Sequence, residues 1–331
     1  MATQKKQNDN LVKIVDLLNT DKNVSGNDIA QELSISRAAI WKAIKKLQSY
    51  NVPITTYKDG YKLECQITLL NQDKILKQIK DSHNVNLELF ESIESTNQYC
   101  LDNNNYNHNQ VDVCLAEFQS LGKGRLGRQW LSPFGQNLCL SLSTTINTDL
   151  SNLGGLSLAI SLAVVETLKQ ITKNDEIKVK WPNDIIYKKQ KLSGNLIQII
   201  SEQNGTCKIV IGVGINVNSD PKIEVLHNIN QAWTSLKEIT KQNIDRNILA
   251  AKLINNILDH LNLFIKDGFE SFISQWEKND FFFNKEISLI HKDKVIVGLE
   301  KGIDKHGHLL LEVNGKTQSY SCGETSFAKP I

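Results

Sequence analysis

The sequence has no Cys-x-x-Cys pair, although six cysteines are spread between positions 65 and 322. Their spacing matches neither a zinc site nor a disulfide framework, so reduced thiols in a cytoplasmic protein are the favoured interpretation. The seven histidines are equally scattered, and no two of them stand four residues apart. We therefore expect no metal site built from the protein's own side chains.

Long apolar runs are also lacking. Residues 1–10 contain no apolar segment of the kind that a signal peptide requires. The most apolar run, Leu153 to Val165, is too short to cross a bilayer and is interrupted by Gly and Ser, so it predicts a buried core helix. The formal net charge of +2 is too small for the whole chain to bind nucleic acid, so any such binding must be local.

Residues 10–63 have the pattern of a winged helix-turn-helix. Apolar residues recur at helical spacing from Leu11 to Leu18, and a short helix is expected over about 27–33. A turn then leads to Ser36, a good N-cap for a helix over 37–49. Residues 52–63 alternate in polarity and turn at Asp59-Gly60, as a β-hairpin does.

The helix over 37–49 carries a basic face and no acidic residue. In a winged helix-turn-helix this second helix of the pair enters the major groove. The candidate DNA contacts are Ser36, Arg37, Lys42, Lys45 and Lys46. A solvated basic face of a protein-binding module is the alternative. DNA binding is favoured because the basic face lies on the helix that is inserted.

The rest of the chain predicts an α+β protein of two further domains. Helices are expected over about 71–80, after Ser95-Thr96, over 151–169 and from Asp245 to Gly268, with strands over 111–118, 138–145, 177–180, 192–200 and 208–217. The polar stretch 102–110 is expected to be a surface loop. Short strands and turns over 281–328 indicate a small β-barrel. The predicted domains are 1–66, 67–276 and 277–331.

Residues 121–128 match G-x-G-x-x-G and follow a predicted strand. A dinucleotide-binding motif needs a helix next, but 129–135 has the composition of a loop, and the Lys-Ser/Thr ending of a P-loop is absent. What remains is a glycine-rich loop with three cations, Lys123, Arg125 and Arg128. Such a loop can close over an anionic ligand, because glycines let backbone N–H groups approach and arginine binds phosphate or carboxylate. A mobile surface loop is the alternative.

Two further segments have polar residues in positions suited to a site. Pro182 ends a strand, which places Asn183 and Asp184 at its carboxyl end, although Pro-Asn-Asp also suits an ordinary turn. Lys191 adjoins an apolar strand, so of the nearby lysines it is the best candidate to point inward and stabilise a phosphoryl transition state. Solvation of all these lysines is an equally open alternative.

The strand over 209–218 places β-branched residues on one face and small or polar residues on the other. The second face carries Gly212, Gly214, Asn216 and Asn218. Glycines weaken a strand unless something approaches its backbone closely. A ligand lying on this face accounts for them, and close packing of a helix is the alternative.

Taken in order, these motifs resemble the bifunctional biotin–protein ligases and biotin-operon repressors of bacteria. The likeness runs through SRAAIWKAI, ESTNQY, AEFQSLGKGRLGRQWLSPFG, VKWPNDIIYKKQKLSG, VIGVGIN and GIDKHGHLLLE followed by GE, over essentially the whole chain. The resemblance implies a winged helix, a central mixed sheet with helices of the class II synthetase-like biotin and lipoate ligase fold, and a C-terminal SH3-like barrel.

The resemblance also implies a two-step reaction and a regulatory role. Biotin and ATP form biotinyl-5′-AMP, with Mg²⁺ screening the phosphates, and biotin then passes to a lysine of the biotin carboxyl carrier protein of acetyl-CoA carboxylase. Family members repress biotin-synthesis genes by binding operator DNA, as homodimers when biotinyl-5′-AMP is bound. The rival interpretations are a ligand-sensing transcription factor without ligase activity, a lipoate ligase and a purely structural DNA-binding protein.

Carried over position by position, the resemblance assigns the site. Biotin is expected to contact Ser95, Thr96, Asn97, Gln119, Gly122, Arg125, Lys191, Gly212 and Gly214. The nucleotide is expected to contact Arg125, Arg128, Asn183, Lys191, Asn216 and Trp233. Lys191, Arg125 and Asp184 are the expected catalytic residues, and Mg²⁺ arrives with ATP, with Asp184 as a candidate contact. The chain departs from the family pattern at Lys123, Cys139, Asn195 and Ala328.

Overall fold

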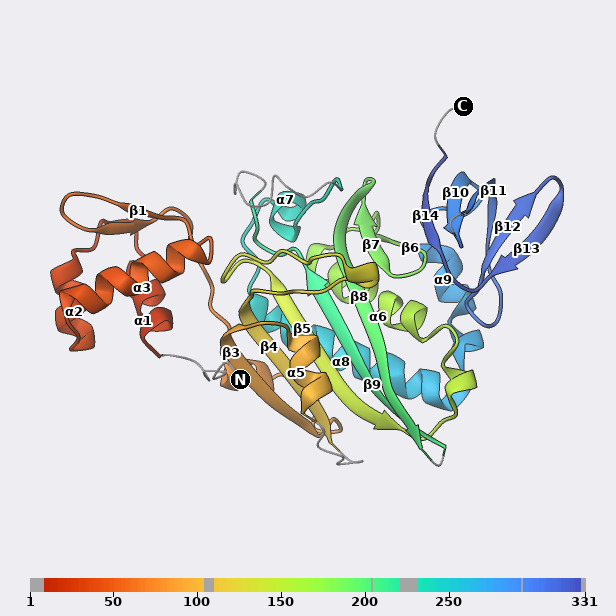
Figure 1. The fold of residues 1–331 in the computed structure, drawn as a ribbon, viewed down its shortest axis with the longest axis horizontal. Helices are drawn as coiled ribbons and strands as arrows, with labels where there is room; N and C mark the ends of the chain where they lie inside the picture. The colour runs from red at the N-terminus through yellow and green to blue at the C-terminus, as the bar shows by residue number, and fades with distance from the viewer. Residues whose placement is uncertain (1–8, 104–109, 204, 221–230, 293, 329–331) are drawn as a thin grey trace.

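The computed structural model describes residues 9–103, 110–203, 205–220, 231–292 and 294–328. Along the chain it has a helical N-terminal region, a central seven-stranded sheet with helices on both faces, and a C-terminal five-stranded sheet (Figure 1). The α+β class and the three-part order predicted from the sequence are confirmed. Most of the 102–110 loop, the turn residue Asp293 and the C-terminal residues 329–331 lie outside the described residues.

The N-terminal region is a winged helix-turn-helix. Its elements are α1 (Asp9–Leu18), α2 (Gly26–Leu33), α3 (Arg37–Ser49) and a hairpin of β1 (Ile54–Thr56) and β2 (Tyr61–Leu63). The Ser25 and Ser36 side chains accept backbone N–H bonds at the starts of α2 and α3, which satisfies donors that a helix N-terminus leaves unpaired. The predicted cap at Ser36 and the predicted bounds of α3 are confirmed.

The central sheet has the strand order β3-β4-β5-β9-β8-β7-β6. Its strands are β3 (Val85–Ile93), β4 (Val111–Gln119), β5 (Leu138–Ile146), β6 (Lys178–Lys180), β7 (Asp184–Tyr187), β8 (Gln190–Gln203) and β9 (Thr206–Ile215). Only β3 and β4 pair in parallel among these neighbours. The sequence did not predict β3 or β7. Strand β6 does end before Pro182, but Asp184 is already the first residue of β7 and pairs with Lys180 across the turn.

Helices cover both faces of this sheet. One face packs against the long helices α6 (Leu156–Thr172) and α8 (Arg246–Asp267), and the opposite face carries the short helix α5 (Thr96–Asp102). Along β4, Val113 and Leu115 join the main core, whereas Cys114 and Ala116 join a smaller cluster beneath α5. Leu150–Thr172 and Arg246–Asp267 reach the length and hydropathy of a membrane span, but more than half of each is buried within the protein.

The C-terminal region is an antiparallel sheet of the order β13-β12-β11-β10-β14. Its strands are β10 (Glu286–His291), β11 (Lys294–Ile303), β12 (Leu309–Val313), β13 (Lys316–Tyr320) and β14 (Glu324–Phe327), preceded by α9 (Ile273–Asn279). Short helices α4 (Gln72–Leu76) and α7 (Leu236–Thr240) complete the described fold. Helix α4 is shorter than the predicted 71–80, and α6 begins five residues after the predicted start because a separate turn occupies Leu150–Leu153.

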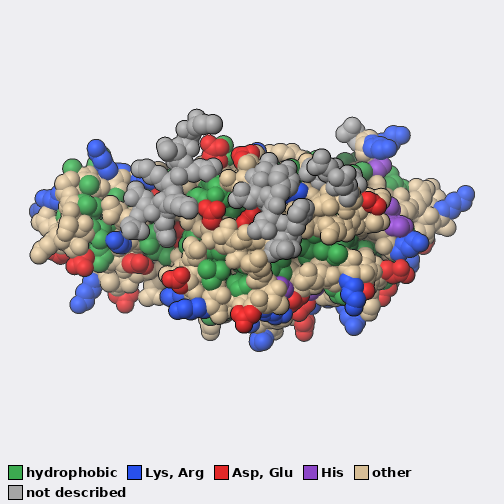
Figure 2. Space-filling model, turned by 90° about the horizontal axis from the view of Figure 1, so that it is seen from below, with side chains coloured by type: hydrophobic (Ala, Val, Ile, Leu, Met, Phe, Trp, Pro, Cys, Tyr) green, Lys and Arg blue, Asp and Glu red, His purple; other side chains and the backbone are tan. Residues whose placement is uncertain are grey.

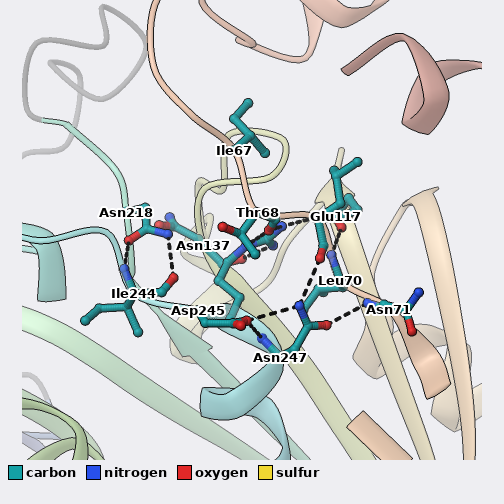
Figure 3. A network of polar contacts seen from close by, with 12 residues as sticks. Ile67, Thr68, Leu70, Asn71, Glu117, Asn137, Asn218, Ile244, Asp245 and Asn247 are labelled. Atoms are coloured by element: carbon teal, nitrogen blue, oxygen red, sulfur yellow. Dashed lines mark hydrogen bonds and ion pairs between the residues drawn. The ribbon is translucent and has the colours of Figure 1, made fainter. Parts of the chain in front are cut away.

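A buried polar network holds the segment that follows the winged helix (Figure 3). The Arg246 guanidinium lies 2.6 Å from the Glu117 carboxylate, and both side chains are fully buried. Arg246 also donates to the carbonyls of Thr68 and Asn137, which satisfies a charge that is otherwise costly to bury. The start of α8, the sheet and the segment after the hairpin are thereby joined.

Aromatic side chains join the winged helix to the central region. The ring of Tyr50, at the end of α3, stacks on Phe118 of β4 with ring centres 4.2 Å apart. Its backbone carbonyl accepts the N–H of Phe134 at 3.0 Å, in the segment after the glycine-rich loop. The face shown in Figure 2 mixes acidic and basic side chains in its coloured part, in keeping with the small net charge.

Candidate active site

A cavity of about 720 Å³ opens over β5, β8 and β9. Glycine-rich loop residues, the β6–β7 turn and the first residues of β14 also line it. Of the predicted ligand-binding and catalytic residues, the lining includes Ser95, Thr96, Asn97, Gln119, Arg125, Arg128, Asn183, Asp184, Lys191, Gly212, Gly214, Asn216 and Trp233. Gly122 is the one such residue outside the lining.

One end of the cavity is neutral and rich in hydrogen-bonding groups. The Gln119 side-chain oxygen accepts the backbone N–H of Thr96 at 2.8 Å and its hydroxyl at 2.9 Å. The Ser141 hydroxyl lies 2.5 Å from Asn97 Oδ1 and 2.7 Å from the Thr96 hydroxyl. Ser95 caps α5 with its hydroxyl. This arrangement fixes amide and hydroxyl groups that suit an uncharged polar ring such as a ureido group.

The glycine face of β9 is approached closely by side chains. A Cβ on Gly212 falls 1.9 Å from Asn97 Oδ1, and a Cβ on Gly214 falls 2.4 Å from the Trp130 ring. The glycines therefore admit Asn97 and Trp130 to the cavity floor. At Gly212 the alternative left open by the sequence, close packing of a helix, is what the structure shows, because Asn97 belongs to α5. At Gly214 the approaching group is the Trp130 ring of the loop.

Gly122 serves the shape of the loop. Its carbonyl accepts the N–H of Trp130 at 2.8 Å, and a Cβ there falls 2.5 Å from the Trp130 carbonyl. The close approach of these two backbone segments requires glycine, and it sets where the Trp130 ring lies. The indole nitrogen of Trp130 is buried and has no hydrogen-bond partner within the described residues.

The other end of the cavity is ionic. Lys191 Nζ lies 2.6 Å from Asp184 Oδ1, and Lys180 Nζ lies 3.1 Å from Asp184 Oδ2. Burial by itself raises the pKa of the Asp184 carboxyl, but the two ammonium groups outweigh it and hold that pKa below its usual value. Asp184 is thus a carboxylate at neutral pH, and two lysines around one carboxylate leave a net positive charge for an anionic ligand.

The glycine-rich loop is held by contacts to the β6–β7 turn and to the start of β14. Arg125 donates to the Asn183 side-chain oxygen at 3.1 Å and to the Gly323 carbonyl at 3.4 Å. Arg128 pairs with the Glu324 carboxylate. The loop therefore lies over the cavity with its arginines directed at the β6–β7 turn and at β14. Arg125 and Lys191, which the sequence resemblance assigned to both biotin and the nucleotide, line one cavity.

Trp233 is held at the cavity because residues 232–234 pair with Lys191 as neighbouring strands do. The N–H of Lys191 donates to the Ala232 carbonyl, and the N–H of Thr234 donates to the Lys191 carbonyl, both at 2.9 Å. This places Trp233 beside the ionic end. Residues 221–230, which precede it, lie outside the described residues.

Several lining residues were not predicted from the sequence. Lys180 pairs with Asp184, and Glu324 and Thr325 come from the C-terminal sheet. Ser141 on β5 is fully buried outside the lining, where its hydroxyl contacts Thr96 and Asn97. Only the Gly-Glu pair that forms part of the family resemblance pointed to β14, because a contact between distant segments leaves no local pattern. Cys139, noted as a departure, lies in the lining, and burial raises the pKa of its thiol to about 11.

The described residues do not suit direct coordination of a metal ion. Within them, no three carboxylate, histidine or cysteine side chains gather in one place. Asp184, the candidate contact, already has its two oxygens paired with lysine ammonium groups. A divalent cation therefore finds its oxygen ligands on a bound triphosphate more readily than on this carboxylate.

The candidate DNA-binding residues are divided by the structure. Ser36, Arg37, Lys42 and Lys45 are exposed on or at the start of α3. Lys46 turns toward the central sheet, where its ammonium lies 3.1 Å from the Glu91 carboxylate. Four of the five predicted DNA contacts are therefore exposed to solvent. The fifth, Lys46, lies between the winged helix and β3.

Family models match the three parts of the chain. The biotin/lipoate A/B protein ligase family matches residues 89–216, an HTH domain matches 10–62, and the biotin protein ligase C terminal domain matches 282–327. The central fold and its cavity are thus those of a biotin or lipoate protein ligase.

Similar proteins narrow this class. The chain is 39% identical to the bifunctional ligase/repressor BirA of Escherichia coli over 95% of this chain and 96% of that protein, and 28% identical to BirA of Bacillus subtilis. A biotin protein ligase from Aquifex aeolicus, solved with biotin and ATP, is 29% identical with a TM-score of 0.60 over 73% of this chain and 97% of its own. The chain belongs to the BirA family of bifunctional biotin ligases and repressors.

Proposed function

We propose that this cavity activates biotin with ATP and that the loop over it keeps the product until a carrier protein arrives. The observation that carries the proposal is a single cavity with a neutral hydrogen-bonding end, around Thr96 and Gln119, and a cationic end, around Lys191 and Arg125. Biotinyl-5′-AMP combines an uncharged ring with an anionic phosphate, so its two ends match the two ends of the cavity.

In the first step, a carboxylate oxygen of biotin attacks the α-phosphorus of ATP. The new bond joins that oxygen to phosphorus, and the bond from the α-phosphorus to pyrophosphate breaks. Lys191, held by Asp184 at 2.6 Å, stabilises the negative charge on the phosphoryl oxygens. Mg²⁺, when bound with ATP, supplies further neutralisation of the triphosphate, and we propose that it reaches the site on the nucleotide.

In the second step, a neutral lysine amine attacks the acyl carbon of the adenylate. An amide bond forms, AMP leaves with the bonding electron pair, and the amine loses a proton. Arg125 and Arg128 keep the loop over the adenylate, which limits attack by water. We propose the biotin carboxyl carrier protein of acetyl-CoA carboxylase as the acceptor.

Formation and retention of the adenylate test this proposal. The full chain is mixed with ATP, Mg²⁺ and labelled biotin, and the protein-bound fraction is analysed for biotinyl-AMP. Retained adenylate, followed by transfer to the isolated carrier domain, is the expected result. A parallel reaction with labelled lipoate distinguishes biotin from the other substrate in the name of the biotin/lipoate ligase family that matches residues 89–216. Preferential activation of lipoate overturns the assignment of biotin.

The winged helix supports a second function, repression of biotin-synthesis genes. Its carrying observation is the exposed face of α3, where Arg37, Lys42 and Lys45 lie without an acidic neighbour on the helix. We propose that two copies bind a two-fold symmetric operator when biotinyl-5′-AMP is present. Leu126, on the loop over the cavity, is 74% exposed and supports a contact between copies.

Sedimentation and gel-shift measurements test this second function. With biotin and ATP we expect a shift from monomer to dimer and tighter binding to DNA selected from a random library. Unchanged mass and unchanged DNA binding contradict it. A cytoplasmic location is part of the proposal, supported by free cysteines at all described cysteine positions.

A further inference from the structure

Asn195 is a buried polar side chain between β8 and α6. It is 3% exposed. Its side-chain nitrogen donates to the Ser161 hydroxyl at 2.7 Å, and its side-chain oxygen accepts from the Ser157 hydroxyl at 3.0 Å. A buried amide is costly unless it is hydrogen-bonded, and here both of its ends are satisfied by one helix. The amide therefore fixes β8 against the first turns of α6.

The same residue fixes the turn between β6 and β7. The Asn183 side-chain nitrogen donates to the Asn195 carbonyl at 2.6 Å, and the Asn195 N–H donates to the Asn183 carbonyl at 3.1 Å. The Ser157 hydroxyl also lies 3.3 Å from the Pro182 carbonyl. Residues of α6 and β8 thus hold both the backbone and the side chain of this turn.

The orientation of Asn183 decides which of its atoms faces the loop. Because its nitrogen is used by the Asn195 carbonyl, its oxygen is the atom directed at Arg125, which donates to it at 3.1 Å. A continuous chain of hydrogen bonds therefore runs from Ser161 through Asn195 and Asn183 to the Arg125 guanidinium.

We propose that Asn195 is a positioning residue for the loop over the cavity. Its side-chain amide fixes β8 to α6, its backbone carbonyl and N–H hold Asn183, and Asn183 in turn holds Arg125 in the closed arrangement. The inference rests on the proposed function, in which Arg125 retains the adenylate. It extends that function by placing the determinant of retention in the core helix α6, outside the loop itself.

Asn195→Leu tests the role at nearly constant volume. Removing the amide takes away the two side-chain hydrogen bonds that fix β8 to Ser157 and Ser161, so the Asn195 backbone that holds the turn is no longer anchored to α6 through its side chain. We expect biotinyl-AMP to leave the full chain about tenfold faster, as for the loss of one or two buried hydrogen bonds. The matched control is Thr167→Val on the same helix, where a buried hydroxyl accepts from Asn256 at 2.8 Å away from the cavity. It is expected to lower the melting temperature without changing release.

A double-mutant cycle shows whether Asn195 acts through Asn183. In that case Asn183→Ala and the double variant Asn183→Ala/Asn195→Leu release the adenylate at the same rate. Additive losses overturn the proposed chain of contacts. Ser161→Ala, which removes a single partner of the Asn195 amide, is a milder variant with the same expected direction if the leucine variant does not fold.

Tryptic cleavage of the loop without ligands separates this inference from the proposed function. Arg125 and Arg128 are cleavage sites, and their exposure rises if Asn183 no longer holds the loop. Faster cleavage of Asn195→Leu than of both wild type and Thr167→Val is the expected result. Equal cleavage rates overturn the positioning role, whatever reaction the cavity performs. If wild type forms no adenylate, the proposed function fails independently of this readout.

Discussion

Lys46 on α3 and Glu91 on β3 form an ion pair, with Lys46 Nζ 3.1 Å from Glu91 Oε1. The Glu91 side chain is 3% exposed and the Lys46 side chain is 41% exposed, so the pair joins α3 to the central sheet with its carboxylate buried and its ammonium partly open to solvent. Burial alone lowers the pKa of the Lys46 ammonium, but the Glu91 carboxylate raises it beyond its usual value. Lys46 is thus charged and already neutralised within the protein.

This relationship predicts that neighbouring lysines differ in DNA binding. Lys45→Ala removes an exposed cation, and the salt dependence of DNA affinity should fall by about 0.9 in logarithmic slope for each lost phosphate contact. Lys46→Ala should leave the slope unchanged, because its charge is taken up by Glu91. Titrations at several salt concentrations compare the two. If both variants lose the same amount of salt dependence, Lys46 is not neutralised by Glu91 as described.

The contacts of Arg125 predict that its loss releases the adenylate. Arg125→Gly removes hydrogen bonds to Asn183 and Gly323. Because the lost donor is charged, we expect the adenylate to be released about 10- to 100-fold faster. A filtration assay with labelled biotin measures retained biotinyl-AMP. Lys241→Ala, whose exposed ammonium pairs with Glu238 outside the cavity lining, is the control and should retain the adenylate normally. Retention equal to wild type rules out the role given to Arg125.

Lys191 should control the first chemical step. Lys191→Ala is expected to slow adenylation by about 100- to 1000-fold, by analogy with removing a group that stabilises transition-state charge. Pyrophosphate exchange measures that step. Lys188→Ala is the matched control, because Lys188 lies in the adjoining turn with its side chain 61% exposed. Pyrophosphate exchange at a near-native rate in Lys191→Ala would show that Lys191 takes no part in adenylation.

The junction between α9 and the C-terminal sheet should depend on pH. Burial, and then the nearby Asp280 carboxyl, raise the pKa of Glu300 from 4.5 to about 8, while the N–H of Gly302 and the Lys285 ammonium oppose the shift. Lys178 also faces Asp280 from β6. The raised pKa means that the folded state keeps a proton that the unfolded state has lost.

The contribution of Glu300 to stability should therefore be full below about pH 4.5 and fall as the pH rises toward about 8, where it levels off. Glu300→Gln should flatten this part of the profile, because glutamine does not ionise. Melting temperatures across that range measure the effect, and the exposed Glu286→Gln serves as the control. A wild-type profile that rises between these values disagrees with a protonated Glu300.

Local signals in the sequence predicted much of the fold. Ser36 marked the start of α3 because an N-cap hydroxyl acts on the next turn alone. Strand β7 was missed because Pro182 indicated the end of a strand, whereas the chain turns and Asp184 begins the next one. Helix α6 begins later than predicted because Gly154 and Gly155 separate it from the preceding turn.

The site was predicted best where a residue's neighbours lie close in sequence. Lys191 and Asp184 come from one hairpin, so the motif contains both members of the pair. Lys46 and Glu91, by contrast, belong to different domains, and the periodicity of a single helix cannot distinguish a surface that faces DNA from one that faces another domain. Glycine at 214 indicated a close approach, but the approaching group is Trp130, whose position depends on the fold of the loop.

The pairing of Arg128 with Glu324 bears on how this enzyme can be divided or recombined. Because the roof of the active site is completed by the last strand of the chain, a central domain expressed by itself leaves that arginine without its counter-ion. We expect a chimaera that exchanges only the C-terminal sheet to alter retention of the adenylate, even when every residue of the cavity floor is kept. The protein looks modular, but its active site is built from both the central region and the C-terminal sheet.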